Sequence, residues 1–277
     1  MHPRLLTSLI LFEPFVHQGR SQKENWWIFL RAKQKDVWAS RAQATTKTAK
    51  ALAAWDPRVR ERFAQYAFRE LPTGLYPTAK PSTGSDKPVA LTTPIAQEVA
   101  TYLRPNLNYH REQGPYDKSN SAIPRHDSLF VPDVVGPREH EKGYYRPEGI
   151  IVWNLLPHLR PGTLVLSGAK SVLSTSGDQE RAVARIGIGA GGSGGVADGR
   201  VRHVTLQSGH MVPFEKVNEA AGEMVGWIAR ERQRWEENER RIEEGWRGLA
   251  VNERIGLSRE WKRLAEINEQ MFGKAKL

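Results

Sequence analysis

The chain has 277 residues, of which 39% are apolar, and it carries a formal net charge of +10 at neutral pH. Its length and apolar share suffice for one large globular domain or for one domain with an inserted cap. Because it contains no cysteine, disulfides, cysteine-bound zinc and a thiol nucleophile are excluded. The eight histidines are scattered and lack the spacing of a zinc site, so we expect neither a metal ion nor a cofactor.

Residues 5–12, LLTSLILF, form the first apolar run, which is bounded by Pro3 and Pro14. A run of this length and composition is typical of a strand buried on both faces. An arginine and this short run resemble a signal peptide, but Glu13-Pro14 follows without a small-residue cleavage site. No apolar run in the chain is long enough to span a membrane.

The basic charge is concentrated near the start of the sequence. Residues 1–60 hold eleven Lys and Arg against four Asp and Glu, and four tryptophans lie among them. Bases interleaved with aromatic residues are typical of surfaces that bind nucleic acid, which is one reading of this segment. No nucleic-acid-binding motif accompanies them, and tryptophans at helical spacing also pack a cap or a ligand pocket. We therefore rank nucleic-acid binding last among the functions considered below.

Residues 23–72 show apolar side chains every three or four positions, which predicts helices. Within this stretch Asp56-Pro57 has the chemistry of a helix N-cap followed by a first-turn proline. Residues 106–149 are poor in periodicity and rich in Pro, Gly, Asn and charge, so we predict loops there.

Two further strands are predicted downstream. GTLVLSG (162–168) follows a Pro-Gly turn, and VRHVTL (201–206) runs into the turn at Gly209-His210, before a helix that opens at Pro213. A histidine held at the carboxyl end of a parallel strand occupies the place where open α/β sheets build their sites. The alternative is that this histidine only bonds to its own turn.

The ordered set of segments resembles the C-terminal half of an α/β-hydrolase. The similarity is greatest to fungal α/β-hydrolases of the toxin-biosynthesis kind, which have stretches similar to WDPRV, LPTGLYP, YLRPN, YYRPEG, GGSGG and GHMVPFE. It covers roughly residues 2–240 of the chain. The resemblance implies that His210 matches the general base of the family.

The fold implied is α/β, with about three parallel strands from the C-terminal part of a hydrolase sheet and a large helical cap insertion. We divide the chain into a core strand (1–16), the cap insertion with its loops (17–150), the C-terminal core strands with the base-bearing loop (151–230) and a charged helical tail (231–277). The first strand is expected to have an apolar, unpaired edge, which is a template for pairing with another chain.

The resemblance also predicts a nucleophilic serine in a G-x-S-x-G turn between a strand and a helix. In this sequence the corresponding segment is expected to lie before Met1, so we expect a truncated or inactive form. A formal match exists at residues 191–195, around Ser193. We set Ser193 aside as nucleophile because RIGIGAG is a poor strand, VADGRV is a loop, and too few residues separate it from His210.

Two residues are candidates for the acid that orients His210. The usual place shortly after the strand TLVLSG holds Ser171 instead of an aspartate. The other place in this fold is the end of the preceding strand, where Glu13 stands before Pro14, and we favour Glu13. Asp178 is the second choice, with a helix N-cap as the alternative role for its side chain.

Three functions follow from these residues and from the resemblance. The first is descent from a serine hydrolase that acts on an ester, thioester or similar acyl bond of a secondary-metabolism or lipid substrate, with the cap covering the small-molecule acyl substrate. The second is a non-catalytic binding protein that keeps the cap and pocket. The third is the basic nucleic-acid binder.

The final tripeptide, Ala275-Lys276-Leu277, resembles the C-terminal signal that peroxisomal import receptors bind. We therefore expect a peroxisomal location and an import receptor as partner. The alternative is a frayed basic helix end and a cytoplasmic location.

Overall fold

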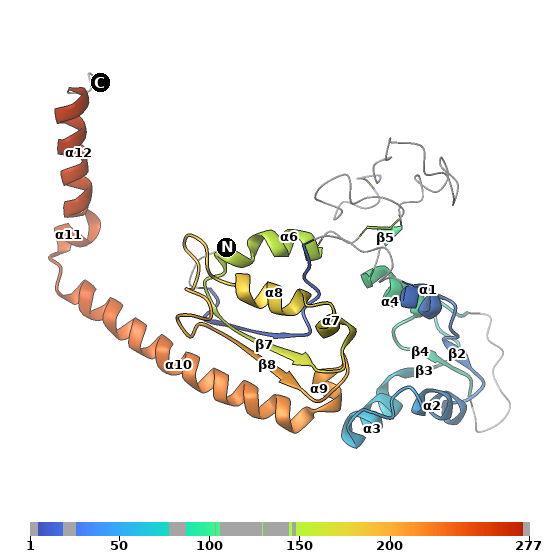
Figure 1. Cartoon of the computed structure of the whole chain (residues 1–277). Coiled ribbons are helices and arrows are strands. Elements are labelled where there is room, and N and C mark those ends of the chain that lie inside the picture. The colour runs from blue at the N-terminus through green and yellow to red at the C-terminus, as the bar shows by residue number, and fades with distance from the viewer. Residues whose placement is uncertain are drawn as a thin grey trace. The chain divides into compact units, whose positions relative to one another are not determined.

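The computed structural model describes residues 5–18, 26–77, 87–102, 104–105, 129, 144–145 and 148–273 (Figure 1). The chain divides into two compact units, Met1–Val225 and Gly226–Leu277. The first unit contains a parallel sheet with its helices and a smaller layer of helices and strands, which we call the lid (residues 26–77 and 87–102). The candidate site belongs to the first unit.

Three parallel strands form the core sheet, in the order β1-β7-β8. They are β1 (Ser8–Phe12), β7 (Gly162–Gly168) and β8 (Val201–Leu206). Every residue of β7 is buried because this strand pairs on both sides. Among the described strands β1 pairs only with β7, through Ser8↔Gly162 to Phe12↔Leu166. The prediction of an α/β fold with three parallel strands is confirmed.

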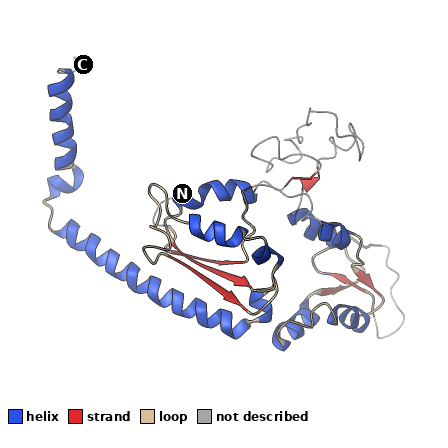
Figure 2. Cartoon of the chain, viewed as in Figure 1, coloured by secondary structure: helices blue, strands red, loops and turns tan. Residues whose placement is uncertain are grey.

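Helices cover both faces of this sheet (Figure 2). Helices α6 (Glu148–Leu155) and α8 (Asp178–Arg185) lie on one face, with the 3-10 turn η3 (Leu156–His158) after α6. Their apolar side chains form the main core with the sheet, and burial of each large one contributes about 1.5–3 kcal/mol. The buried members of this cluster are Trp153, Leu156, Val165, Ala182, Val183, Ile186 and Val201.

On the other face lies the start of α10 (Val217–Arg247), which follows the short helix α9 (Val212–Glu215). Arg202 of β8 forms an ion pair with Glu223 of α10 at 2.7 Å. A further short helix, α7 (Val172–Thr175), connects β7 to α8. The turn that carries His210 therefore lies between the end of β8 and the helices α9 and α10.

The lid contains four helices: α1 (Trp26–Ala32), α2 (Arg41–Ala49), α3 (Pro57–Tyr66) and α4 (Ile95–Tyr102). It also contains an antiparallel sheet in the order β2-β4-β3. These strands are β2 (Val37–Trp38), β3 (Phe68–Glu70) and β4 (Val89–Leu91). The prediction of helices across residues 23–72 is wrong at β2 and β3, because strands of two or three residues are too short to show alternation.

Helix α3 begins as its sequence predicts. Asp56 is the N-cap, its side chain accepts a hydrogen bond from the backbone N–H of Arg58, and Pro57 is the first helical residue. Arg41 of α2 ties the end of this helix to β3 by donating to the carbonyls of Ala64, Gln65 and Phe68.

A two-stranded ladder joins β5 (Arg104–Pro105) to β6 (Tyr144–Tyr145). The second unit consists of the remainder of α10 with α11 (Val251–Ile255) and α12 (Arg259–Phe272). In the described part of the chain, no helix has the combined length and apolarity that a membrane crossing requires. The tripeptide Ala275-Lys276-Leu277 lies outside the described residues, so its targeting role stays a prediction.

Candidate active site

Three polar residues meet at the carboxyl edge of the core sheet. Glu13 directly follows β1, Ser171 lies three residues after the end of β7, and His210 lies four residues after the end of β8. Parallel strands end at the same edge of a sheet, so residues far apart in the sequence come together there. The structure thus brings Glu13 and His210 together across 197 positions of sequence.

Glu13 is buried, with 5% of its surface exposed, and its φ is +47°. This left-handed backbone conformation costs a residue with a side chain about 1–3 kcal/mol and persists only where the surroundings hold it. Its backbone N–H donates to the carbonyl of Leu166 at 3.0 Å, which extends the β1–β7 ladder by one residue. The sheet therefore fixes the direction in which the carboxylate points.

The Glu13 carboxylate accepts three hydrogen bonds. Oε1 accepts from the backbone N–H of Gly168, and Oε2 accepts from the hydroxyl of Ser171 and from Nδ1 of His210, the last at 2.9 Å. Burial raises the pKa of the Glu13 carboxyl, but the hydrogen bonds from His210, Ser171 and Gly168 outweigh it and hold that pKa below its usual value of 4.5. The group is therefore a carboxylate at neutral pH.

An ionised carboxylate can only accept hydrogen bonds, so Nδ1 of His210 carries the proton that the two groups share. The opposite ring nitrogen, Nε2, then holds a lone pair in the neutral ring. The His210 side chain is 53% exposed, whereas that of Glu13 is 3% exposed. Within the described residues no hydrogen bond reaches Nε2. The imidazole is thus oriented from its buried side and can accept a proton on its open side.

The turn that carries His210 is braced on both sides. The backbone N–H of Gly209 donates to Glu215 Oε2 at 2.7 Å, and Lys170 N–H donates to the carbonyl of Ser208 at 2.9 Å. A Cβ added at Gly168 would lie 2.0 Å from the carbonyl oxygen of Gly209. Only glycine at position 168 permits this close approach of the two chain segments.

The lid contacts helix α9, which begins two residues after His210. The rings of Trp55 and Phe214 lie 4.7 Å apart between centroids, and the backbone N–H of Asp56 donates to the Phe214 carbonyl at 2.8 Å. Arg58 adds a hydrogen bond to Asn218 at 2.9 Å. These contacts attach the start of α3 to α9 and to the start of α10, which follow the turn of His210.

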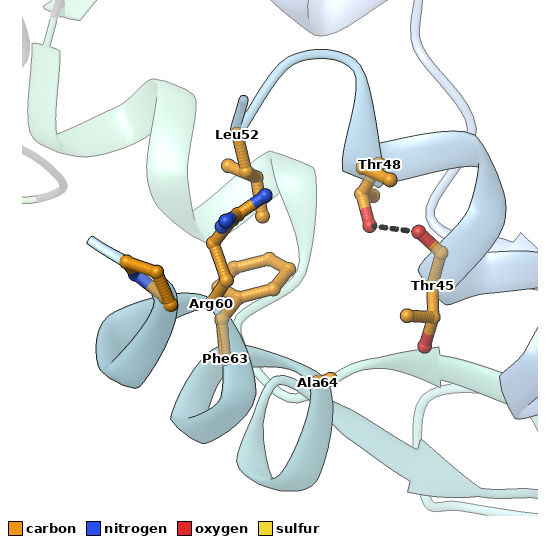
Figure 3. Close-up of a pocket in the computed structure, with 8 residues that line it drawn as sticks. Thr45, Thr48, Leu52, Arg60, Phe63 and Ala64 are labelled. Atoms are coloured by element: carbon orange, nitrogen blue, oxygen red, sulfur yellow. Dashed lines mark hydrogen bonds between the residues drawn. The ribbon is translucent and has the colours of Figure 1, made fainter. Parts of the chain in front are cut away.

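A pocket of about 220 Å³ opens between α2 and α3 (Figure 3). The Thr48 hydroxyl is already bonded to the carbonyl of Thr45. The rest of the lining is mainly apolar, with Arg60 as its only charged side chain. The full set is Thr45, Thr48, Ala49, Leu52, Pro57, Arg60, Phe63 and Ala64. The sequence pattern predicted a pocket in the cap but not its residues.

Ser193 and His210 lie at opposite ends of β8. Ser193 precedes the strand in a loop of glycines with positive φ, and its backbone N–H donates to the Leu159 carbonyl at 2.9 Å. A strand of this length separates its two ends by about 20 Å. Asp178, the second candidate acid, is the first residue of α8 and pairs with Arg181 at 2.5 Å. It is not the N-cap, which is Gly177.

A second serine–histidine contact lies inside the sheet. Nε2 of His203 on β8 is 2.8 Å from the hydroxyl of Ser167 on β7. Ser167 is completely buried, so no substrate reaches its oxygen in this conformation. Among the described residues, no group of three or more His, Asp or Glu could hold a metal ion.

Two residues that support the site, Gly168 and Glu215, were not apparent as such from the sequence. Glu215 is the last residue of GHMVPFE, so the motif contained it without revealing that it bonds back to the glycine of the same turn. Ser171 was noted only as the residue in the usual place of the acid. The distance between Ser171 and Glu13 depends on the register in which β1 pairs with β7. The sequence alone does not give this register, so the contact was not predicted.

No family model matches the chain. It is similar to the type I acyl-CoA thioesterase of Penicillium roqueforti, with 32% identity over 94% of this chain and 61% of that protein. It is also similar to a type I acyl-CoA thioesterase of Penicillium brevicompactum, with 33% identity over 88% of this chain and 58% of that protein. The chain spans about 60% of the length of these curated relatives.

Two solved structures are similar at 14% identity. One is a peroxisomal alpha-beta-hydrolase from Saccharomyces cerevisiae, which matches 99% of this chain and 58% of its own with a TM-score of 0.44. The other is a thioesterase domain from the curacin biosynthetic pathway, which matches 80% of this chain and 59% of its own with a TM-score of 0.40.

Proposed function

We propose that this chain, which belongs to the α/β-hydrolase superfamily, supplies the acid, the base and the lid of an acyl-bond hydrolase that cleaves acyl-CoA thioesters. The observation that carries the proposal is the hydrogen bond between buried Glu13 and exposed His210. The names of the Penicillium relatives supply the substrate class. We further propose that the acyl group of this substrate comes from secondary metabolism or from a lipid.

In this mechanism Nε2 of His210 takes the proton of a nucleophilic hydroxyl as its oxygen attacks the thioester carbonyl carbon. The Glu13 carboxylate stabilises the imidazolium that forms. The same proton then passes to the departing CoA thiolate, and water, activated by His210, hydrolyses the acyl-enzyme. Glu13 remains ionised throughout, which agrees with the direction of its pKa.

Among the described residues no serine hydroxyl is bonded to Nε2 of His210, so none of them is assigned as the nucleophile. We propose that the nucleophile comes to this site beside β1. Among the described strands the outer edge of β1 has no partner strand, and β1 ends at Glu13. A further parallel strand at this edge would end near the same imidazole.

We propose that the lid pocket receives part of the acyl group. Its lining includes apolar Leu52 and Phe63. Phe63 contacts Trp55, with ring centroids 5.7 Å apart, and Trp55 contacts Phe214 near the base. An apolar pocket connected in this way to the catalytic turn suits a substrate with an apolar body.

A second candidate function is an acyl-CoA-binding protein without turnover. The specific observation that favours it is that Nε2 of His210 lacks a hydroxyl partner in the described part of the chain. This candidate keeps the lid and the pocket but assigns no chemistry to the histidine.

Thiol release from a panel of acyl-CoA esters separates the two candidates. This assay, like every turnover assay below, uses the chain together with the further strand beside β1 that supplies the nucleophile. The chain contains no cysteine, so a thiol-reactive dye detects only the CoA that is released. Turnover that disappears in His210→Ala but persists in His203→Gln supports the hydrolase. Saturable binding of acyl-CoA without turnover supports the binding protein. Neither binding nor turnover with any ester contradicts both.

A further inference from the structure

We propose that Ser171 is a positioning residue, whose hydroxyl holds the Glu13 carboxylate where it orients His210. The catalytic consequence rests on the proposed function, whereas the contact itself does not. Ser171 is 1% exposed, and its hydroxyl donates to Oε2 of Glu13, the oxygen that also accepts from His210. A serine thus occupies the usual place of the acid in order to hold an acid that comes from the neighbouring strand.

The direction of the Ser171 hydroxyl is fixed by a second bond. Ser171 is the N-cap of α7, and its oxygen accepts the backbone N–H of Leu173 at 3.2 Å. Because the oxygen receives that N–H, its own proton is directed at Glu13. The start of α7 therefore presents a donor of defined orientation to the carboxylate.

Loss of this donor has a cost that the rest of the site does not remove. Glu13 is buried, and a buried carboxylate needs its hydrogen bonds to stay ionised. Gly168 binds the other oxygen, Oε1, so it does not take over the contact at Oε2. Without Ser171 the oxygen that faces His210 keeps only the imidazole as partner.

The same geometry makes position 171 a second place for an acid. The Ser171 hydroxyl and Nδ1 of His210 bind one and the same oxygen, so they lie within two hydrogen-bond lengths of each other. An aspartate side chain reaches further than a serine side chain. A carboxylate introduced at position 171 therefore reaches the imidazole when Glu13 is no longer charged.

The first test follows the Glu13 carboxyl by carbon NMR as a function of pH in the full chain. We expect Ser171→Ala to raise the pKa of Glu13 and Ser176→Ala to leave it unchanged. Ser176 is the matched control because it lies at the end of the same helix and donates to the Leu173 carbonyl, not to Glu13. An unchanged titration of Glu13 in a folded Ser171→Ala chain would overturn the proposal.

The second test exchanges the charge between the two positions. Glu13→Gln should abolish His210-dependent turnover. The double variant Glu13→Gln/Ser171→Asp should turn over at least tenfold faster than Glu13→Gln alone. In the wild-type background Ser171→Asp should instead lower turnover, because two carboxylates would crowd one imidazole. Aspartate also caps a helix, so α7 is preserved. The proposal would be contradicted if Ser171→Asp lowered turnover in the wild-type background and gave no increase in the Glu13→Gln background.

The two tests separate failure of the positioning role from failure of the proposed function. The NMR titration needs no turnover. A shift of the Glu13 titration in Ser171→Ala without turnover in any variant would support the positioning contact and contradict the hydrolase. Turnover with an unshifted Glu13 would support the hydrolase and contradict the role of Ser171.

Discussion

The lid and the corner, which is formed by Glu13, Gly168, Ser171 and His210, are held by different forces. In the corner, three donors from two segments converge on a single buried carboxylate. In the lid, edge-to-face rings pass from the small sheet to the base-bearing turn. These rings, which we call the aromatic chain, are Trp38, Phe68, Phe63, Trp55 and Phe214.

The corner and the lid differ in how strictly their contacts fix geometry. Hydrogen bonds to a charged group are directional and contribute about 1.5–3 kcal/mol each, so they fix the imidazole for proton transfer. Ring pairs contribute about 0.5–1.5 kcal/mol beyond their burial and allow a range of offsets. The aromatic chain is therefore less strictly oriented than the corner, where directional bonds to a charged group fix the geometry.

The largest effect is expected from neutralising the acid. Glu13→Gln keeps the size of the side chain but removes the charge that stabilises the imidazolium, and kcat/KM for thioester cleavage should fall by about 10²–10⁴-fold. Asp178→Asn is the control, because Asp178 pairs with Arg181 at the start of α8. Steady-state thiol release measures both variants. Loss of turnover in Asp178→Asn with turnover kept in Glu13→Gln would reverse the assignment of the acid.

The corner was largely predictable from the sequence. GTLVLSG is a buried strand, whereas SLILF is a strand whose residues are only partly buried, so the expectation of burial on both of its faces is wrong. The residues that follow parallel strands meet at one edge of the sheet. The pairing of Glu13 with His210 was expected from the resemblance to α/β-hydrolases, which implies an acid at the end of the first strand. The positive φ of Glu13 and the donors that surround its carboxylate were not predictable, because they depend on how the strand ends approach one another.

The lid was predicted less well for a physical reason. Residues 37–38 and 68–70 form strands only because Phe68 and Val89 pack on Ala44 and because Arg41 fixes three carbonyls. Tertiary contacts of this kind override local periodicity in short segments. The N-cap at Asp56 was correct because its signal is local.

The next largest effect is expected from the close approach of the backbone at Gly168 to the backbone at Gly209. Gly168→Ala places a Cβ against the Gly209 carbonyl oxygen, and forcing the two segments apart should cost about 1–3 kcal/mol of unfolding free energy. Urea unfolding followed by circular dichroism measures it. Gly222→Ala is the matched control: it lies in α10 with open space around it, and it should stabilise the chain by about 0.5–1 kcal/mol. Equal effects of the two variants would contradict the steric argument.

A smaller, local effect is expected in the aromatic chain. Trp55→Ala removes the ring contacts to Phe63 and Phe214, and α3 should open about tenfold more often, which corresponds to about 1.4 kcal/mol. Hydrogen exchange of the backbone amides measures this opening. Amides of α8, which packs on the core sheet, should exchange as in the wild type. Equally faster exchange in α8 would show that the lid and the core unfold together.

The smallest effect is the dependence of stability on pH that the Glu13 carboxyl imposes. The pKa of Glu13 is lower in the folded chain than its usual value of 4.5, so folding favours the ionised form. The resulting stabilisation is present above that value and disappears as the pH falls through the folded pKa. Glu13→Gln lacks it at every pH. The wild type and Glu13→Gln should therefore differ most in unfolding free energy near neutral pH and converge below pH 4.5, as measured by urea unfolding across the pH range. A constant difference would mean that the variant acts through packing alone, because a change in charge must disappear once the carboxyl is protonated in both the folded and the unfolded chain.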